Sequence, residues 1–387
     1  MNINIGNFWK INQPTAGRLT LIKNLNKIAS KKQENKMRSN KINNVDLFTS
    51  SANDKFSKHI KTQSKQALEI INSKINWTKL LRPIEETITK TKQNNSPAGR
   101  RTFDLLVIVK CFILQSIYNL SDPRLEEEIA DRRSFQIFLG LNSSDSIPDE
   151  TTICRYRELF ATLELDKKLF YGFNKQLTEL NFIVGKGTIV DATIKQAQAK
   201  PKSNRDNDAD FTIKRGKTYY GYKGHIAIDE DSEVIKSVEF TKASFHDSSA
   251  FDRLVDYSEQ AIFADKAYAN KTRRNKLEAI GVFDGILAKG YRNKPLSKSE
   301  KKVNKLLSTI RNKVERPFAY MKQVLQYQQC SYYDIGRNRF EFIMCAFVYN
   351  IRRLVTLTTW YTSNIQKSRN YEFSICQWTI KIKRSNE

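Results

Sequence analysis

The sequence has few histidines, few cysteines and no long uninterrupted apolar run. Its three histidines (His59, His225 and His246) are widely separated, which argues against a histidine-based zinc site. Its five cysteines form no CxxC pair and no metal-ligand spacing, so we interpret them as reduced thiols of a cytosolic protein. The longest apolar stretches are Phe103–Leu120, which Asp104 and Lys110 interrupt, and Phe340–Ile351. Neither provides the roughly 20 apolar residues of a membrane span, and we expect both to form buried helices.

Acidic residues are scarce relative to basic ones. The chain has 66 Lys and Arg against 41 Asp and Glu, a formal net charge of +25. Residues 1–100 carry +13 and residues 183–387 carry +15, whereas residues 101–182 carry −3. Such a charge indicates a polyanionic partner. It does not distinguish a nucleic-acid enzyme from a binding protein or a ribosomal component.

The length of 387 residues predicts two or three domains, and a hydrophobic content of 40% is sufficient for packed cores. Residues 1–65, rich in Asn, Lys and Ser, are expected to form a basic and largely flexible arm. Residues 66–182 have helical periodicity, residues 183–355 alternate strands with helices, and residues 356–387 form a basic tail. No apolar segment with a cleavage site marks the N-terminus for export. Met1 and Met37 are both open as translation starts.

The region 66–182 is predicted to be entirely helical. Residues 66–90 have an apolar face, with a break expected at Pro83. Phe103–Tyr118 is apolar nearly all round, which is typical of a central buried helix. Asp122 and Pro123 provide an N-cap and a first-turn proline for the next helix, and Pro148-Asp149 begins another in the same way. Short helices joined by tight turns favour a packing of the helix-turn-helix kind.

After Gly187 the pattern changes to a mixed α/β domain. A buried strand is predicted at Thr188–Ile194 and a long mobile loop at Gln196–Thr218. Further strands are predicted at Tyr222–Ile228, Val234–Phe240, Ala261–Ala264 and Phe283–Ala288, and helices at Ser248–Tyr257, Thr272–Ile280, Ser297–Glu315 and Phe340–Leu354. This order predicts a mixed sheet whose early strands are joined by hairpins and whose later strands are joined by crossovers.

Three carboxylates have unusual positions. Asp191 lies inside an apolar strand, Asp265 directly follows another, and Glu315 lies on a basic helix. A carboxylate in a buried strand costs free energy unless it is paired or binds a cation, and distant carboxylates that converge can bind Mg²⁺. Each also has a plainer interpretation: a strand-end Asp as a turn or helix cap, and Glu315 as the partner of Arg311 one turn earlier.

The local sequences around these acids are more informative than the acids alone. The segments GTIVDATI, DADFTIKRGKTYYGYKGHIAID, TKASFHDSSAF, AIFADKAYAN and RNKVERPFAYMK occur in this order over residues 187–354. Together they resemble the DDE-type transposases of bacterial insertion sequences, and more narrowly the insertion-sequence-five group. The upstream stretch YNLSDPRLEEEIADRRSFQIFLGL…IPDETTICRYRE resembles the InsH-type N-terminal domain of the same proteins. The resemblance implies a helical DNA-binding or dimerisation domain at residues 66–182 and a ribonuclease H-like catalytic domain at residues 183–355.

The resemblance also implies roles for individual residues. It makes Asp191, Asp265 and Glu315 the catalytic triad and the metal ligands. Arg311 and Lys322 match the two cations of the third family motif and are implied DNA contacts, on one helical face with Glu315. That motif usually begins with Tyr, where this chain has Ser308, which puts one DNA contact in doubt. Pro317 is expected to kink or restart the helix.

Further DNA contacts are weighed against simpler interpretations. Those we predict are Lys214, Arg215, Lys217, Tyr220 and His225. The three cations are equally well explained as a solvated basic loop, and the alternating tyrosines as packing residues. His225 either faces the active site or packs within the sheet. His246-Asp247 matches a family motif, but Asp247 or Ser248 also suits a plain helix cap.

These observations together predict a transposase. We expect it to bind the terminal inverted repeats of its element, cleave phosphodiester bonds there, and transfer the 3′-hydroxyl ends to target DNA. The expected cofactor is Mg²⁺, with Mn²⁺ as a substitute, in a two-metal site. The expected partners are double-stranded DNA and further copies of the chain, as a homodimer or higher synaptic complex, in the cytoplasm at the nucleoid. The alternatives are a catalytically inactive or co-opted copy acting as a DNA-binding repressor and, less well supported by the charge, a metal-dependent phosphatase.

Overall fold

The computed structural model describes residues 63–92, 103–142, 144–183, 185–198, 206–214, 216–291 and 295–358. The basic arm predicted for residues 1–65 lies outside these ranges except at its last three positions. The tail predicted for residues 356–387 also lies outside them except at its first three positions, and Arg215 is outside as well.

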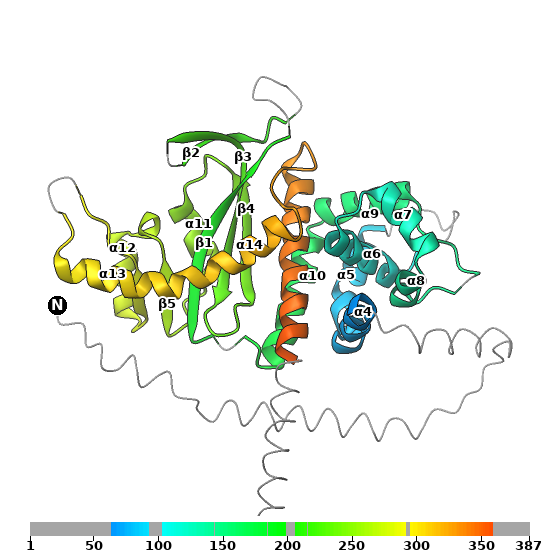
Figure 1. Ribbon diagram of the computed structural model, residues 1–387, viewed down its shortest axis with the longest axis horizontal. Helices are drawn as coiled ribbons and strands as arrows, with labels where there is room; N and C mark the ends of the chain where they lie inside the picture. The colour runs from blue at the N-terminus through cyan, green and yellow to red at the C-terminus, as the bar shows by residue number, and fades with distance from the viewer. Residues whose placement is uncertain are drawn as a thin grey trace, which may run out of the picture. The chain divides into compact units, whose positions relative to one another are not determined.

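The described chain before the sheet is helical, as predicted. Its helices are α4 (Gln63–Lys74), α5 (Trp77–Lys92), α6 (Leu105–Tyr118), α7 (Asp122–Asp131), α8 (Arg133–Leu139), α9 (Glu150–Thr162) and α10 (Leu165–Glu179) (Figure 1). Helix α6 is the central one, with Ile108, Val109 and Leu114 fully buried. Among the described residues no single helix has the length and apolarity to cross a membrane. Helices α6 and α7 meet that test only jointly, as a pair bent by 102°.

The predicted break at Pro83 is wrong. Pro83 lies inside α5, and the chain breaks earlier, between α4 and α5. The side chain of Asn76 accepts a hydrogen bond from the backbone N–H of Lys79 at 3.1 Å and so closes the start of α5. Burial of Leu80 and Ile84 on either side of Pro83 stabilises the helix against the loss of one backbone hydrogen bond.

The cap predicted at Asp122 is also displaced by one residue. Ser121 is the N-cap of α7, and its hydroxyl accepts from the backbone N–H of Arg124. Asp122 is the first helical residue, and its carboxylate instead accepts from Arg157 at 2.7 Å. Because Arg157 is only 3% exposed, its charge needs such a partner. The start predicted at Asp149 is confirmed: Asp149 caps α9.

The second half of the chain builds a mixed, six-stranded sheet. Its strands are β1 (Gly187–Gln196), β2 (Asp210–Lys214), β3 (Lys217–Asp229), β4 (Ile235–Lys242), β5 (Ala261–Ala264) and β6 (Phe283–Ile286). The order is β4-β3-β1-β5-β6, with β2 pairing to the outer end of β3. β3 runs antiparallel to β1 and β4, whereas β5 and β6 run parallel to β1. The ribonuclease H-like mixed sheet flanked by helices is therefore confirmed.

The mobile loop predicted for Gln196–Thr218 is wrong in part. Its second half is a strand, β2, which forms a hairpin with the beginning of β3. The segment Asp210–Lys214 is too short and polar to stand out by periodicity, and among the described strands it pairs only with β3.

Helices cover both faces of the sheet. On one face α11 (Asp247–Leu254) and α12 (Lys271–Ala279) pack on a core that includes Val190, Ala227 and Ile262. On the other face α13 (Lys298–Arg311) and α14 (Glu315–Gln323) cross β1 and β5 (Figure 1). The helix over residues 335–358 lies on this second face as well, where Phe342 contacts Tyr327 and Phe240.

The expected restart near Pro317 is confirmed. Helix α13 ends at Arg311, a 3₁₀ turn covers Asn312–Val314, and α14 begins at Glu315. Proline has no N–H, and its ring would collide with the carbonyl oxygen four residues earlier, at Lys313. The α-helical hydrogen-bonding pattern therefore lapses just before Pro317, and Glu315 becomes the first residue of a new helix.

Candidate active site

Two of the three predicted carboxylates belong to neighbouring parallel strands, with Asp191 inside β1 and Asp265 directly after β5. Val190 of β1 pairs in register with Ala264 of β5, and Asp191 and Asp265 are the next residues of each segment. Asp265 begins the 3₁₀ turn Lys266–Tyr268, and its side chain makes no capping hydrogen bond. The two acids therefore lie at one edge of the sheet, close enough that the charge of Asp265 raises the pKa of Asp191.

Asp191 is the better defined of the pair. Its Oδ1 accepts from the backbone N–H of Ala192 at 2.8 Å, and its Oδ2 accepts from the guanidinium of Arg311 at 2.8 Å. Burial raises the pKa of Asp191 above its ordinary value, whereas the charges of Arg311 and Lys214 act in the opposite direction. The ionised form of Asp191 thus depends on nearby positive charge.

Glu315 is held differently from the two aspartates. It is the first residue of α14, its side chain is 67% exposed, and its Oε1 lies 3.8 Å from the guanidinium of Arg311. Arg311 therefore links Glu315 to Asp191. Within the described ranges, no group of three or more His, Cys, Asp or Glu side chains is arranged to hold a metal ion.

The carboxylate oxygens of Asp191, Asp265 and Glu315 suit a hard divalent cation, although the three side chains do not converge on one point. Mg²⁺ binds oxygen ligands and usually takes only one or two carboxylates from the protein. Asp191 and Asp265 supply such oxygens side by side, and a cation between them would relieve their repulsion. Asp265 would offer its carboxylate without breaking a cap hydrogen bond. Glu315 is exposed enough to turn toward that edge.

Positive charge surrounds the same edge. Burial lowers the pKa of Lys322 on α14, and the charge of Lys214 on β2 lowers it further. Lys214 also acts on Asp191, so these two lysines and Arg311 belong to one neighbourhood. Two ammonium groups that repel one another beside a carboxylate pair form a suitable site for an anion such as a phosphate.

The other predicted DNA contacts are distributed along the β2–β3 hairpin. Lys217 is exposed, and its Nζ lies 5.7 Å from the centre of the Tyr219 ring. Tyr220 is half-buried; its hydroxyl donates to the carbonyl oxygen of Asp206 at 2.8 Å, and its ring contacts Phe211. Lys217 is therefore more accessible to solvent than Tyr220.

The prediction that His225 contacts DNA is corrected. His225 is fully buried, and its Nε2 is 2.9 Å from the hydroxyl oxygen of Thr241. It pairs with Ala192, the residue after Asp191, so strand alternation puts it on the opposite face of the sheet from Asp191. The cap of α11 is likewise neither Asp247 nor Ser248: it is His246, whereas Asp247 forms an ion pair with Lys223 at 3.0 Å.

Tyr268 is a residue at this edge that the sequence argument did not single out. It ends the 3₁₀ turn that begins after Asp265 and is only 1% exposed. Its hydroxyl has no hydrogen-bond partner among the described residues. Burial raises its pKa well above the ordinary value, and the charges of Asp191 and Asp265 add to this effect. The motif ADKAY could have identified Tyr268, because a single 3₁₀ turn brings the third residue after Asp265 back toward the carboxylates.

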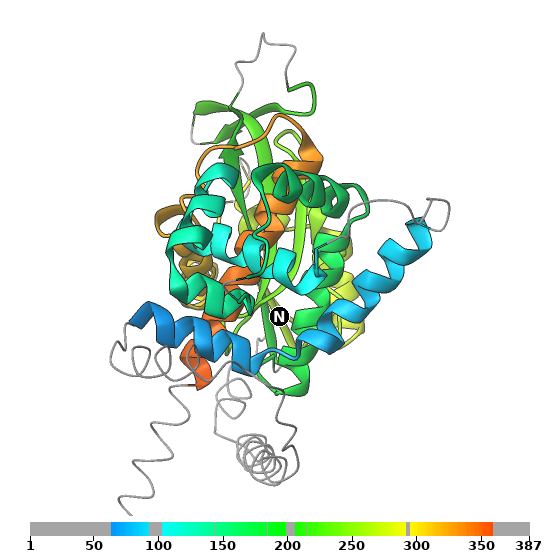
Figure 2. The same ribbon diagram turned by 90° about the vertical axis from the view of Figure 1, so that its right-hand side faces the viewer.

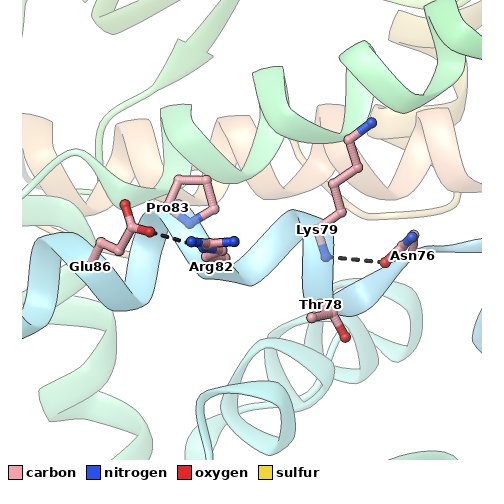
Figure 3. Close-up of a pocket in the computed structure, with 6 residues that line it drawn as sticks. All are labelled: Asn76, Thr78, Lys79, Arg82, Pro83 and Glu86. Atoms are coloured by element: carbon pink, nitrogen blue, oxygen red, sulfur yellow. Dashed lines mark hydrogen bonds and ion pairs between the residues drawn. The ribbon is translucent and has the colours of Figure 1, made fainter.

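The structure also has a surface pocket on α5. It is lined by Asn76, Thr78, Lys79, Arg82, Pro83 and Glu86 (Figure 3). All six come from one short segment, and its charged side chains include the exposed Arg82–Glu86 ion pair at 3.1 Å. No residue of the sheet contributes to it, so it is separate from the carboxylate edge.

Comparison with known proteins finds matches to two family domains and a remote likeness to a solved transposase structure. A family model described as a transposase DDE domain matches residues 184–351, and a second model described as a transposase domain matches residues 55–159. Among solved structures, the piggyBac transposase in a synaptic complex with hairpin DNA is similar with a TM-score of 0.42 and 10% identity. That likeness covers 76% of this chain and 73% of the other.

Proposed function

The chain belongs to the DDE-type transposases of insertion sequences, and from that premise we propose that it cuts the ends of its own element and joins them to new DNA. It would bind the terminal inverted repeats, hydrolyse one phosphodiester at each end, and transfer the freed 3′-hydroxyl to target DNA. The observation that carries this proposal is the position of Asp191 and Asp265 directly after the paired residues Val190 and Ala264, beside Lys214 and Lys322.

Asp191 and Asp265 would hold the catalytic cation, and Glu315 would complete a second position. Mg²⁺, or Mn²⁺ in its place, would supply an activated nucleophile and neutralise the charge on the leaving oxygen. Asp191 is held in place by its hydrogen bonds from Ala192 and Arg311, so its free oxygen lone pairs point in a defined direction. Glu315, held only by one long ion pair, would complete the site by moving toward the aspartates.

The cations beside the carboxylates would hold the DNA backbone. Lys322 and Lys214 repel one another, so a phosphate between them removes an unfavourable interaction as well as adding two favourable ones. Lys217 and Tyr220 would contact the same DNA farther along the hairpin. Such contacts release counterions, and binding should therefore weaken steeply as salt rises.

The remaining parts of the proposal concern assembly. Both ends of an element must be held together during joining, so we expect a homodimer or a larger synaptic complex. The helical region that matches the second transposase domain would provide end recognition or contacts between copies. The basic arm would add phosphate contacts, and the protein would act at the nucleoid in the cytoplasm.

The decisive experiment incubates the purified full chain with labelled duplexes that carry the two flanking ends of its own gene. We expect nicking at the element boundary that requires Mg²⁺ or Mn²⁺ and is absent in Asp191→Asn and Glu315→Gln. The matched control is Glu278→Gln, which changes an exposed glutamate on α12 and should cleave normally. Binding without cleavage in either metal would favour a repressor, whereas cleavage by Glu315→Gln at the wild-type rate would remove Glu315 from the site.

A further inference from the structure

The β2–β3 ribbon (residues 210–214 and 217–221) exposes apolar side chains that nothing in the described structure covers. Ile213 is 73% exposed, the highest value for any large hydrophobic residue in the described ranges, and Phe211 is 49% exposed. β2 pairs with β3 and with no other strand. An isoleucine in that position is unfavourable in water and has no role in holding the ribbon together.

The exposed apolar side chains share one face of the ribbon. Phe211 pairs with Tyr220 and contacts its ring at 4.9 Å. Ile213, two residues beyond Phe211, continues the same face toward the tip. Phe211, Ile213 and Tyr220 therefore share one face of the ribbon, and Lys214 and Lys217 share the other.

Gly221 determines the direction of the ribbon. Its φ is +153°, and a Cβ atom added there would lie 2.1 Å from the carbonyl oxygen of Lys195 and 2.7 Å from the backbone nitrogen of Ala197. Only glycine fits this point without moving the backbone. Beyond it the ribbon runs at an angle across the end of the sheet, and it is the green hairpin at the top of both views (Figures 1 and 2). The charge of Lys214 acts on both Asp191 and Lys322, which indicates that the ribbon leans toward the carboxylates.

The charges on the ribbon identify the class of its partner. Lys214 and Lys217 are paired directly across the two strands, an arrangement of like charges that destabilises a hairpin. Neither lysine forms a salt bridge among the described residues, although the charge of Lys214 acts on Asp191. A polyanion would convert this repulsion into attraction. DNA is the polyanion that also offers apolar surface, on the faces of its bases, to Ile213 and Phe211.

We infer that the β2–β3 ribbon is a wedge that opens the DNA end, with Ile213 entering the base stack next to the bond held at Asp191. This inference rests on the proposed function. Lys214 and Lys217, which flank the turn of the ribbon, bind phosphates. The contact between the rings of Phe211 and Tyr220 stabilises the ribbon next to Ile213. Unstacking the terminal bases kinks the duplex, which lets the scissile phosphodiester approach the carboxylates more closely.

The first test measures base unstacking directly. Duplexes carrying the flanking ends contain the fluorescent base 2-aminopurine at successive positions around the cut site. Binding of the full chain should raise its emission at one or two positions, because the fluorescence of this base is quenched by stacking. Ile213→Ala should bind the duplex but lose most of this rise. Leu306→Ala removes a comparably exposed leucine on α13 (62% exposed) and should retain the full rise.

The second test asks whether an already open duplex replaces the wedge. Ile213→Ala should cleave the intact duplex about tenfold more slowly than wild type, which corresponds to about 1.4 kcal/mol. Mismatches at the two terminal base pairs should restore its rate to near that of wild type, since the cost of unstacking has then been removed in advance. A variant impaired merely in folding would be equally slow on both substrates.

The outcomes separate the wedge from the proposed function. If wild type neither binds nor cleaves the ends, the proposed function fails, and the wedge fails with it. If wild type cleaves and Ile213→Ala matches it in rate and in fluorescence, only the wedge is overturned. If Ile213→Ala instead dissociates a dimer, as size-exclusion chromatography would show, while the fluorescence rise is unchanged, the patch is a contact between copies and the inference is also overturned.

Discussion

Arg311 and Asp191 form a charge-assisted hydrogen bond of 2.8 Å between residues 120 positions apart in the sequence. The guanidinium joins the end of α13 to the middle of β1, and its second nitrogen lies 3.8 Å from Glu315. One cation thus balances the half-buried acid of β1 and keeps the third acid nearby. This arrangement explains how a strand can carry an ionised aspartate before any metal is bound.

The pair predicts a pH effect on cleavage. The charge of Arg311 lowers the pKa of Asp191, so Arg311→Gln should let that pKa rise. Cleavage that needs ionised Asp191 would then begin at a higher pH, and the acidic limb of the pH–rate profile should move upward. The measurement is the nicking rate as a function of pH. Arg82→Gln, which alters an exposed ion pair on α5, should leave the profile unchanged.

Alanine substitutions at Gly221 and Gly281 distinguish the strain of a positive φ from a steric collision of the new Cβ atom. Gly221→Ala places a methyl group against backbone atoms at 2.1 and 2.7 Å, so the ribbon must shift. Gly281→Ala is the matched control, because Gly281 also has a positive φ (+73°) but open space around its Cβ position. We expect about 1 kcal/mol of lost stability at Gly281 and about 3 kcal/mol at Gly221, by urea unfolding.

Cleavage should distinguish the same two variants more sharply. Gly221→Ala should lose most of its activity at temperatures where it is still folded, because the ribbon no longer leans over the carboxylates. Gly281→Ala should retain its activity. Equal stability and equal activity in the two variants would show that the bend at Gly221 is not required.

His225 predicts how stability depends on pH. Burial lowers the pKa of His225 against the opposing charge of Asp247, and with the smaller effect of Lys223 the result is a pKa of about 4. The unfolded chain binds this proton near pH 6.5 and the folded chain only near pH 4, so stability falls as the pH decreases through that window. The loss attributable to this residue is up to about 3 kcal/mol, at 1.36 kcal/mol per unit.

The measurement for His225 is urea unfolding of wild type and His225→Gln between pH 4 and pH 7. Glutamine can keep a hydrogen bond to the hydroxyl of Thr241 but does not titrate. We expect the two proteins to differ in slope below pH 6.5 and to have parallel stability curves above it. Identical slopes throughout would mean that His225 has the same pKa in the folded and the unfolded chain.

The sequence was most informative where an apolar run is interrupted by a single polar residue. The runs around Asp191 and before Asp265 predicted β1 and β5, and the same interruption marked both acids as candidates. That the two meet at one edge follows from parallel pairing, which short apolar strands with a crossover favour.

Other features depend on contacts that no local pattern encodes. β2 is polar and becomes a strand because it pairs with a free edge of β3. The sequence pattern predicted a loop there and so gave no sign that Ile213 lies exposed on a strand. His225 could face either side of the sheet until the register with Ala192 was known. Pro83 looked like a helix end, but burial of its neighbours outweighs one missing hydrogen bond.

Lys195 offers a final test, of the link between β1 and the helix over residues 335–358. It is fully buried, its Nζ lies 2.7 Å from Oε2 of Glu341, and the same ammonium lies 3.8 Å from the centre of the Tyr327 ring. Lys195→Met should cost about 3 kcal/mol of unfolding free energy, because Glu341 is left with a charge and no cation.

The double variant Lys195→Met/Glu341→Gln should regain much of that loss, since the uncompensated charge has been removed. Glu341→Gln alone should destabilise less than Lys195→Met, because the carboxylate is 25% exposed and its removal leaves an ammonium that still lies over an aromatic ring. Urea unfolding of all four proteins provides the coupling energy. Additive losses in the double variant would mean that Lys195 stabilises the strand through packing, with its charge making no contribution, and the ion pair would then have no part in holding the helix to β1.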